Sequence, residues 1–316
     1  MKQIAYGVFA GVFLQVRRKM ESGFKKGMSN PKPCYLTARK IKNMPDYRRD
    51  EVLGRLRAEL DRGKHLLAVG AGTGITAKFA ERGGADLIVI YNSGRYRMSG
   101  FGSCAGLLAY GDANAIVMEM GEREVLPVVQ ETPVIAGVNG TDPTRRMRNF
   151  LKQVRDVGFD GVNNFPTVGV IDGTFRVTLE ETGMGFYKEV ETIGIAHEMD
   201  LFTIVYVFNP EESENMAKVG ADVIIAHMGT TIGGTIGAET AFTLEDAALR
   251  VQEICDAAQS VNPNVICLSH GGPISKAPEA AFINEKTDAV GFVGASSIER
   301  FACEESIPRV TASFKE

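Results

Sequence analysis

The chain has 316 residues, a length that allows two ordinary domains or one α/β barrel with an appendage. With 44% hydrophobic and 23% charged residues, its composition excludes a disordered chain, a collagen-like repeat and a coiled coil. The net charge of −4, without a long basic run, argues against a nucleic-acid-binding protein.

The first segment of the chain is expected to be an extension outside the folded domain. Ile4–Leu14 is apolar but shorter than the ~20 residues of a membrane span. Basic residues follow it directly, which disfavours a cleaved export signal. We therefore predict a poorly ordered extension over residues 1–43, a barrel domain over residues 44–316 and no membrane partner.

From Asp50 onward the chain repeats one pattern, in which a short apolar run is followed by a glycine-bearing turn and an amphipathic stretch. Continuous apolar runs are typical of strands covered on both faces, so the pattern predicts an α/β fold, a single (β/α)8 TIM barrel. The eight expected strands are His65–Val69, Asp86–Tyr91, Pro133–Val138, Gly161–Asn164, Phe202–Val207, Asp222–His227, Val265–His270 and Ala289–Val293.

Helix signals fall between these strands. Asp142 and Asn209 each precede a proline, as an N-cap precedes the first residue of a helix, and Thr243 is followed three residues later by an acid. The run Asn114–Met120 fits either a ninth strand or one face of a helix. Because eight strands close the barrel, we predict a helix over Asp112–Val129. Further helices are expected over Asp50–Arg62 and Glu304–Phe314.

Small and hydrogen-bonding residues follow nearly all of the expected strands. The working face of such barrels lies at the carboxyl ends of the strands, so these residues predict a pocket for a small, oxygen-rich ligand. Arg95 is either a surface residue or the cation for a ligand carboxylate, with Arg97 as its competitor. The candidate substrate-binding residues are Gly72, Thr73, Asn92, Ser93, Arg95, Asn164 and Thr167.

A nicotinamide cofactor is disfavoured, because the glycines of residues 70–74 lack the full GxGxxG spacing and no acid follows the next strand to bind a ribose. The loops after the seventh and eighth strands are expected to bind phosphate or carboxylate through backbone N–H groups. The two serines of the second loop have an alternative role as caps of the last helix. The residues of these loops are Gly271, Gly272, Gly294, Ala295, Ser296 and Ser297.

Two of the four histidines, His227 and His270, end neighbouring strands. Both side chains are expected at the barrel mouth, as an acid/base pair, as metal ligands, or as hydrogen-bonded barrel packing. Asp142 is the third catalytic candidate. An iron site of two histidines and one carboxylate would need Asp142, Asp172 or Glu180 nearby.

Several ordered runs together resemble the phosphoenolpyruvate hydrolase-like TIM-barrel proteins, also called TIM-barrel signal transduction proteins. They span much of the chain from Met44 to its last residue. The runs are GAGTGITAKFAERGGADLIVIYNSGR (70–95), DANAIVMEMGEREVLPVV (112–129), TDPTRRMRNFLKQV (141–154), NFPTVGVIDGTFR (164–176), EETGMGF (180–186), AHMG (226–229), HGGPIS (270–275) and GASSIER (294–300).

The resemblance implies a relationship to the phosphoenolpyruvate mutase and isocitrate lyase group, whose members cleave or rearrange C–C or P–C bonds of 2-oxo acids using Mg²⁺. That group carries an Asp-x-Asp pair after the third strand, where this chain has GVNG (137–140). Mg²⁺ is therefore a possible cofactor, and no metal ligands are assigned. The family also occurs as the second half of longer proteins, including plant inhibitors of viral RNA replication.

We therefore expect a cytoplasmic, homo-oligomeric lyase or hydrolase that acts on a small phosphorylated or carboxylated 2-oxo acid, resembling phosphoenolpyruvate or phosphonopyruvate. A non-catalytic metabolite sensor or protein-interaction module in signalling is the alternative. An iron-dependent dioxygenase is a minor one. The odd number of cysteines, without a CxxC pair, favours reduced thiols and therefore the cytoplasm.

Overall fold

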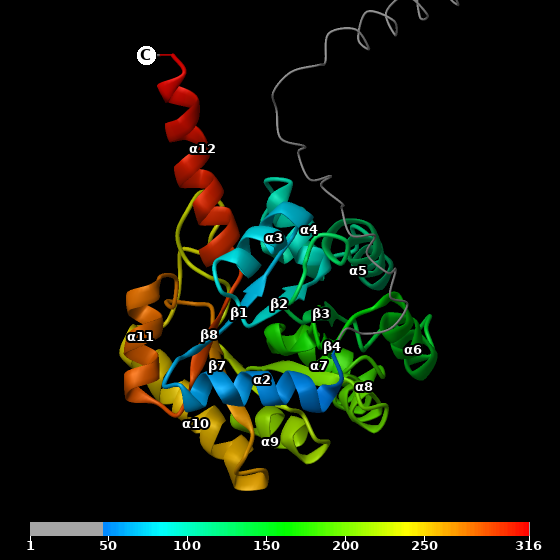
Figure 1. Cartoon of the computed structure of the whole chain (residues 1–316). Coiled ribbons are helices and arrows are strands. Elements are labelled where there is room, and N and C mark those ends of the chain that lie inside the picture. The colour runs from blue at the N-terminus through cyan, green and yellow to red at the C-terminus, as the bar shows by residue number, and fades with distance from the viewer. Residues whose placement is uncertain (1–46, 316) are drawn as a thin grey trace, which may run out of the picture. The chain divides into compact units, whose positions relative to one another are not determined.

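A computed structural model describes residues 47–315, in which eight parallel strands close into one barrel (Figure 1). Each strand pairs with the next, and β8 pairs with β1. The predicted barrel is confirmed, and every strand overlaps its predicted range. The strands are β1 (Leu66–Gly70), β2 (Leu87–Ile90), β3 (Val134–Gly137), β4 (Gly161–Asn163), β5 (Phe202–Val207), β6 (Val223–His227), β7 (Ile266–His270) and β8 (Gly291–Gly294).

Helices follow the strands and surround the barrel (Figure 1). The strand residues are buried apart from the half-buried Leu67, because side chains fill the interior while helices cover the exterior. The helices are α2 (Arg49–Asp61), α3 (Gly74–Arg82), α4 (Asn92–Met98), α5 (Ala113–Met120), α6 (Met147–Val157), α7 (Gly173–Glu181), α8 (Phe186–Glu198), α9 (Pro210–Lys218), α10 (Leu244–Val261), α11 (Ala277–Lys286) and α12 (Phe301–Ser313). The short helical turns within residues 47–315 are η1 (Ser103–Leu107), η2 (Gly121–Val125), η3 (Val168–Val170) and η4 (Ser296–Arg300).

The predicted helix starts are confirmed at two of three positions. The side chains of Asn209 and Thr243 accept hydrogen bonds from the backbone three residues on, at the starts of α9 and α10. Asp142 as an N-cap is wrong, because α6 begins only after Arg146. The Asp142 carboxylate instead accepts a hydrogen bond from the Thr144 N–H, two residues on, which stabilises a turn in place of a helix.

The ambiguous run after the second strand is helical, as predicted. Asp112 caps α5 by accepting a hydrogen bond from the Ala115 N–H, and α5 continues into the π-helical turn η2. The last predicted helix is α12, which begins three residues earlier than expected. The predicted extension, residues 1–43, lies outside the described residues. Among residues 47–315, no helix has both the length and the apolar character that a membrane span requires.

Three aspartate side chains form hydrogen bonds to neighbouring strands at the amino-terminal end of the barrel. Asp86, Asp160 and Asp222 each precede an even-numbered strand and accept a hydrogen bond from the backbone N–H of the strand before it, at 2.7–3.0 Å. Asp222 also binds Arg49 of α2 at 2.7 Å. The charge on Asp222 therefore ties α2 to the end of the barrel opposite the expected working face.

We expect Asp222→Asn to lower the free energy of unfolding by about 2–3 kcal/mol, because the amide loses the charge that binds Arg49 and leaves buried donors without a full acceptor. Urea unfolding measures the difference. Asp61→Asn, an exposed carboxylate at the end of α2, is the matched control and should change stability by less than about 0.5 kcal/mol. Equal stability of both variants would show that the anchor contributes nothing.

Candidate functional site

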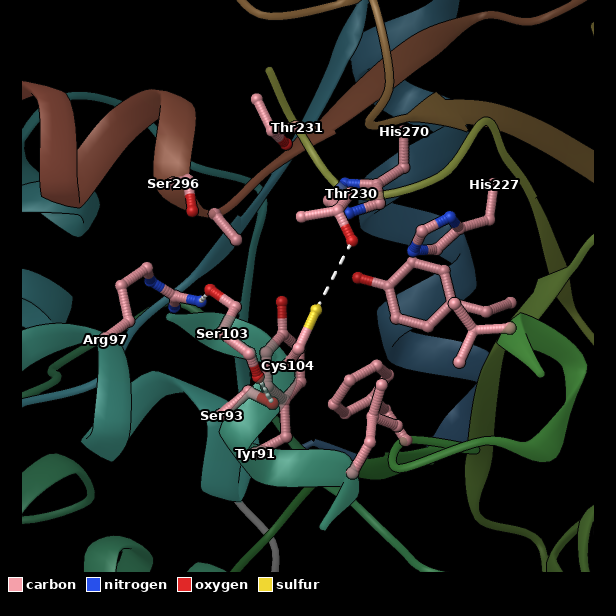
Figure 2. A pocket seen from close by; sticks show the side chains of 15 residues that line it. Tyr91, Ser93, Arg97, Ser103, Cys104, His227, Thr230, Thr231, His270 and Ser296 are labelled. Carbon is pink, nitrogen blue, oxygen red and sulfur yellow. Dashed lines mark hydrogen bonds between the residues drawn. The ribbon is translucent and has the colours of Figure 1, made fainter. Parts of the chain in front are cut away.

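A cavity of about 50 Å³ lies at the carboxyl ends of the strands (Figure 2). Space of this size holds roughly three or four water molecules between the side chains, so the cavity suits a small ligand. The lining combines aromatic walls with hydroxyl, imidazole, thiol and guanidinium groups. The lining residues are Tyr91, Ser93, Arg97, Ser103, Cys104, Leu107, Phe165, Val170, Tyr206, His227, Thr230, Thr231, His270, Ala295 and Ser296.

The two histidines expected at the barrel mouth lie side by side in this cavity. His227 ends β6 and His270 ends β7, and the strand register pairs them directly. Their ring centroids are 4.6 Å apart, and the residues are 8% and 7% exposed. Neighbouring parallel strands place register partners on the same side of the sheet, which explains why both rings enter the cavity.

Backbone contacts assign a different proton position to each ring. The Gly229 N–H donates to Nδ1 of His227 at 3.0 Å, so the proton of neutral His227 is on Nε2. Nδ1 of His270 lies 2.6 Å from the Val293 carbonyl oxygen, which only accepts, so Nδ1 carries the proton and Nε2 has a lone pair. His227 thus offers a hydrogen-bond donor through Nε2, and His270 offers an acceptor.

Both rings are neutral at pH 7. Burial lowers the pKa of His270 to about 4, with the Arg97 charge acting in the same direction and the hydrogen bond to Val293 opposing it. Burial and the neighbouring His270 hold the pKa of His227 well below its usual range. At neutral pH the uncharged His270 can therefore accept a proton, and the uncharged His227 can donate one.

Arg97 is the cation of the cavity. It is 3% exposed and forms an ion pair with Glu299 of η4, with Nε and Nη2 at 2.8 and 2.6 Å from Oε1. The other carboxylate oxygen of Glu299 accepts a hydrogen bond from the Gly72 N–H at 2.8 Å. Through these contacts Glu299 links three segments, which are the loop after β1, helix α4 and the segment after β8.

Arg95 is not among the lining residues. Its guanidinium binds Glu119 and Glu124 at 2.9 and 2.6 Å and is about 30% exposed. Residues two apart on a helix point about 200° away from each other, so Arg95 and Arg97 occupy opposite faces of α4. The structure thus brings Arg97, the competitor, to the cavity.

Of the other predicted substrate-binding residues that follow β1 and β2, one lines the cavity and the others have contacts behind the lining. Ser93 lines the cavity, and its hydroxyl donates to the Ser103 carbonyl at 2.8 Å. Asn92 is buried and donates to the Gly106 carbonyl at 2.8 Å. Thr73 is the N-cap of α3, and the Gly72 N–H is already bound by Glu299.

Asn164 and Thr167 support the wall that carries Phe165 and Val170. The Asn164 amide donates to Glu189 at 2.8 Å, and the hydroxyl of Thr167 caps η3. Burial raises the pKa of Glu189 to about 8, against the hydrogen bonds that it accepts from Thr167 and its neighbours. Neither Asn164 nor Thr167 is among the residues that line the cavity.

The two loops expected to bind an anion contribute two residues to the lining, Ala295 and Ser296. Gly271 and Gly272 have positive φ angles of 75° and 56°, and the Gly272 N–H donates to the Gly229 carbonyl at 2.8 Å. These glycines therefore let the loop after β7 pack closely on the loop after β6. Gly294 and Ser297 are outside the lining as well.

Asp142 belongs to a separate polar cluster. Its carboxylate accepts hydrogen bonds from Asn114 and Thr144 and pairs with Arg145. Burial acts against ionisation, but these partners together lower the pKa of Asp142 to about 2. Asp142 is not among the lining residues, so the structure does not bring it to the histidine pair.

The donor set of the cavity does not fit a metal ion. Within residues 47–315, no three His, Cys, Asp or Glu side chains are grouped as metal ligands. The two-histidine, one-carboxylate arrangement that an iron oxygenase needs is therefore not formed in this part of the chain. The residues that line the cavity also include no carboxylate, which is the side chain that Mg²⁺ prefers.

Ser103 and Cys104 line the cavity but were not among the predicted site residues. They lie in η1, more than ten residues after the end of β2, whereas the predicted site residues lie at or shortly after the ends of strands. Contacts with Ser93 and Arg97 bring this turn back to the cavity. No local sequence signal marks such a return.

The sequence is similar to a protein family and to a curated protein. A family model described as phosphoenolpyruvate hydrolase-like matches residues 51–316. A tomato (Solanum lycopersicum) protein, ToMV susceptible protein tm-1(GCR26), is 56% identical over 265 residues, which are 84% of this chain and 35% of that protein. The chain thus spans about a third of that curated relative.

Two solved structures share the fold. Phosphonopyruvate hydrolase in complex with oxalate and Mg²⁺ has a TM-score of 0.52 at 18% identity, covering 84% of this chain and 87% of that one. Oxaloacetate acetylhydrolase in complex with the inhibitor 3,3-difluorooxalacetate has a TM-score of 0.53 at 14% identity, covering 85% of this chain and 88% of that one. At these identities the likeness concerns the fold alone.

Proposed function

The chain belongs to the phosphoenolpyruvate hydrolase-like family, and from this membership we propose that its cavity binds a small 2-oxo acid and cleaves a C–C or P–C bond of it. The observation that carries the proposal is the histidine pair, with one Nε2 as donor and the other as acceptor, in a cavity that also holds Arg97. The two structural neighbours described above act on phosphonopyruvate and oxaloacetate, which are acids of this class.

Each group has a role in this proposal. Arg97 binds the carboxylate of the substrate, because its guanidinium is a fixed cation with several donors. His270 takes up a proton through Nε2, and His227 donates one from Nε2 to the oxygen or carbon that gains negative charge. Ala295 and Ser296 are proposed as further anion contacts.

No step of this mechanism uses a metal ion. The phosphonopyruvate hydrolase complex contains Mg²⁺, but the residues that line this cavity include no carboxylate. Glu299, which supports Arg97 behind the lining, is already bound to Arg97 and to the Gly72 N–H. In this proposal hydrogen-bond donors and the Arg97 charge stabilise the negative charge of the substrate.

The test is a product assay with oxaloacetate, phosphonopyruvate and phosphoenolpyruvate, followed by NMR, on the full chain with and without added Mg²⁺. Cleavage of one of these acids supports the proposal, and EDTA-resistant cleavage supports the metal-free mechanism. His65→Gln is the matched control for variants of the pair, because His65 is exposed. If no member of the panel gives product, the proposed activity is wrong.

A second function, a metabolite sensor or interaction module, is favoured by one observation. The tomato relative is named for its response to a virus, and this chain corresponds to only part of it. The same panel separates the two functions. A rise in the melting temperature with oxalate or a 2-oxo acid, without product, would support a sensor.

We also propose that the chain forms homo-oligomers through α12. None of the residues of α12 is buried, and the helix extends away from the barrel (Figure 1). Ile307, Val310 and Phe314 recur at helical spacing and are 51–88% exposed, and α3 exposes Ile75 and Phe79. A second copy of the chain would cover these apolar surfaces.

Ile307→Asp is expected to shift the protein from dimer or higher oligomer towards monomer, because a charge would be buried in the contact. Light scattering after gel filtration measures the mass. Glu305→Gln, an exposed polar position on the same helix, should leave the mass unchanged. A wild-type chain that is monomeric at every concentration would contradict the proposal.

A further inference from the structure

Cys104 places a thiol in the same cavity as the two histidines. Its sulfur lies 3.7 Å from the Thr230 hydroxyl, which belongs to the loop after His227 (Figure 2). The residue is exposed, so reagents from solvent reach it. Accessibility is one requirement of a reactive cysteine, whereas buried thiols are inert.

The turn that carries this thiol is held in place by α4. The Asn92 amide donates to the Gly106 carbonyl and the Ser93 hydroxyl to the Ser103 carbonyl, both at 2.8 Å. A Cβ atom on Gly106 would lie 2.0 Å from the Ser93 hydroxyl, so the turn closes on α4 only because this residue is glycine. The position of Cys104 is thus determined by buried contacts.

An independent observation points to a ligand beside the thiol. His227 and His270 are more than nine-tenths buried, yet their Nε2 atoms make no hydrogen bond to any residue between 47 and 315. Both histidines line the cavity, and so does Tyr206, whose buried hydroxyl has no hydrogen-bond partner among the described residues. Buried polar atoms are usually paired, so the cavity presents a polar atom that a ligand would pair. A thiol and a basic imidazole nitrogen that line the same cavity are the two groups that covalent catalysis by cysteine uses.

We propose that Cys104 is the nucleophile of this site and forms a covalent bond with the carbonyl carbon of a 2-oxo acid. The inference rests on the proposed function and adds an acyl-enzyme intermediate to it. Bond formation between sulfur and the carbonyl carbon gives a tetrahedral adduct, from which the C2–C3 bond can break. This route needs no metal ion, which agrees with a lining that offers no set of metal ligands among the described residues.

The steps balance without an oxidant or reductant. His270 takes the thiol proton as the sulfur bonds to C2, and the carbonyl electron pair moves to oxygen, where the Nε2 proton of His227 stabilises it while Arg97 holds the carboxylate. The carbonyl then re-forms as the C2–C3 bond breaks, and the C3 carbanion takes the proton from His270. Water then attacks the thioester and gives a proton to His270. The thioester bond breaks, and His270 passes this proton to the Cys104 thiolate. The products are two acids, from one oxo acid and one water.

The experiment uses oxaloacetate with the full chain, quenched in acid and analysed by mass spectrometry. We expect a mass increase of one oxalyl group, lost on treatment with hydroxylamine and located on Cys104 by peptide mapping. Cys104→Ser should lose the adduct and at least about 100-fold of kcat while keeping its melting temperature. Cys303→Ser, on α12 and outside the lining, is the control and should behave as wild type.

The outcomes separate this inference from the proposed function. Product formation without an adduct, with Cys104→Ser fully active, overturns the nucleophile and leaves the activity standing. A stable adduct on Cys104 without product supports the nucleophile and refutes turnover. If neither adduct nor product forms with oxaloacetate, phosphonopyruvate or phosphoenolpyruvate, both proposals are wrong.

Discussion

Replacing Arg97 with methionine is expected to lower the free energy of unfolding by about 3–5 kcal/mol. The Arg97 and Glu299 side chains are 2% and 1% exposed, so the substitution leaves a carboxylate buried without its counter-charge. The same carboxylate accepts the Gly72 N–H, so the loop after β1 should loosen as well. Urea unfolding of both proteins gives the difference directly.

Arg95→Met is the matched control for this prediction. Arg95 lies two residues away on the same helix and also binds two glutamates, but these pairs are 30–49% exposed and screened by water. It should therefore change stability by less than about 1 kcal/mol. The double variant Arg97→Met with Glu299→Gln should recover part of the loss. Equal losses in Arg95→Met and Arg97→Met would contradict the importance assigned to burial.

Replacing His270 with glutamine is expected to lower kcat by about 100- to 10,000-fold on the acid identified by the product assay, because glutamine has no basic nitrogen to accept a proton. Glutamine keeps a donor for the Val293 carbonyl, so the loss should appear in kcat more than in stability. His65→Gln should leave kcat unchanged. Full activity of His270→Gln would exclude His270 as the base.

The pH dependence of stability tests the same residue without a substrate. Because the pKa of His270 is about 4 in the folded protein and near 6.5 in the unfolded chain, the unfolded chain binds the proton more readily between these values. The free energy of unfolding should therefore fall as the pH drops from 6.5 to 4, by about 3 kcal/mol from this group. His270→Gln should flatten that part of the profile. An unchanged slope would mean that the ring is not held neutral.

The fold was predictable because its signals are local. Eight apolar runs and the caps at Asn209 and Thr243 depend on residues a few positions apart, and the closed barrel follows from their number. The failure at Asp142 is also local in origin. The side chain that caps a helix also stabilises a turn, and a neighbouring arginine favoured the turn.

The histidine pair could be predicted for a related reason. Two residues that end adjacent strands of a parallel barrel must meet at the same rim, so strand assignment alone brings His227 and His270 together. Their protonation could not be predicted, since it depends on the carbonyl of Val293 and the N–H of Gly229, and on burial by side chains from other strands.

Local patterns in the chain thus sufficed for the barrel, its strand ends and the placement of the two histidines side by side, whereas only the folded molecule determined their neutral state and which polar groups share one cavity. Arg97 rather than Arg95 enters it because of the phase of α4 and a partner 202 positions away, Glu299. Cys104 reaches it because buried side chains draw η1 back over the rim. The direction of a side chain and the partner of a buried charge depend on contacts between distant segments, which the order of residues does not display.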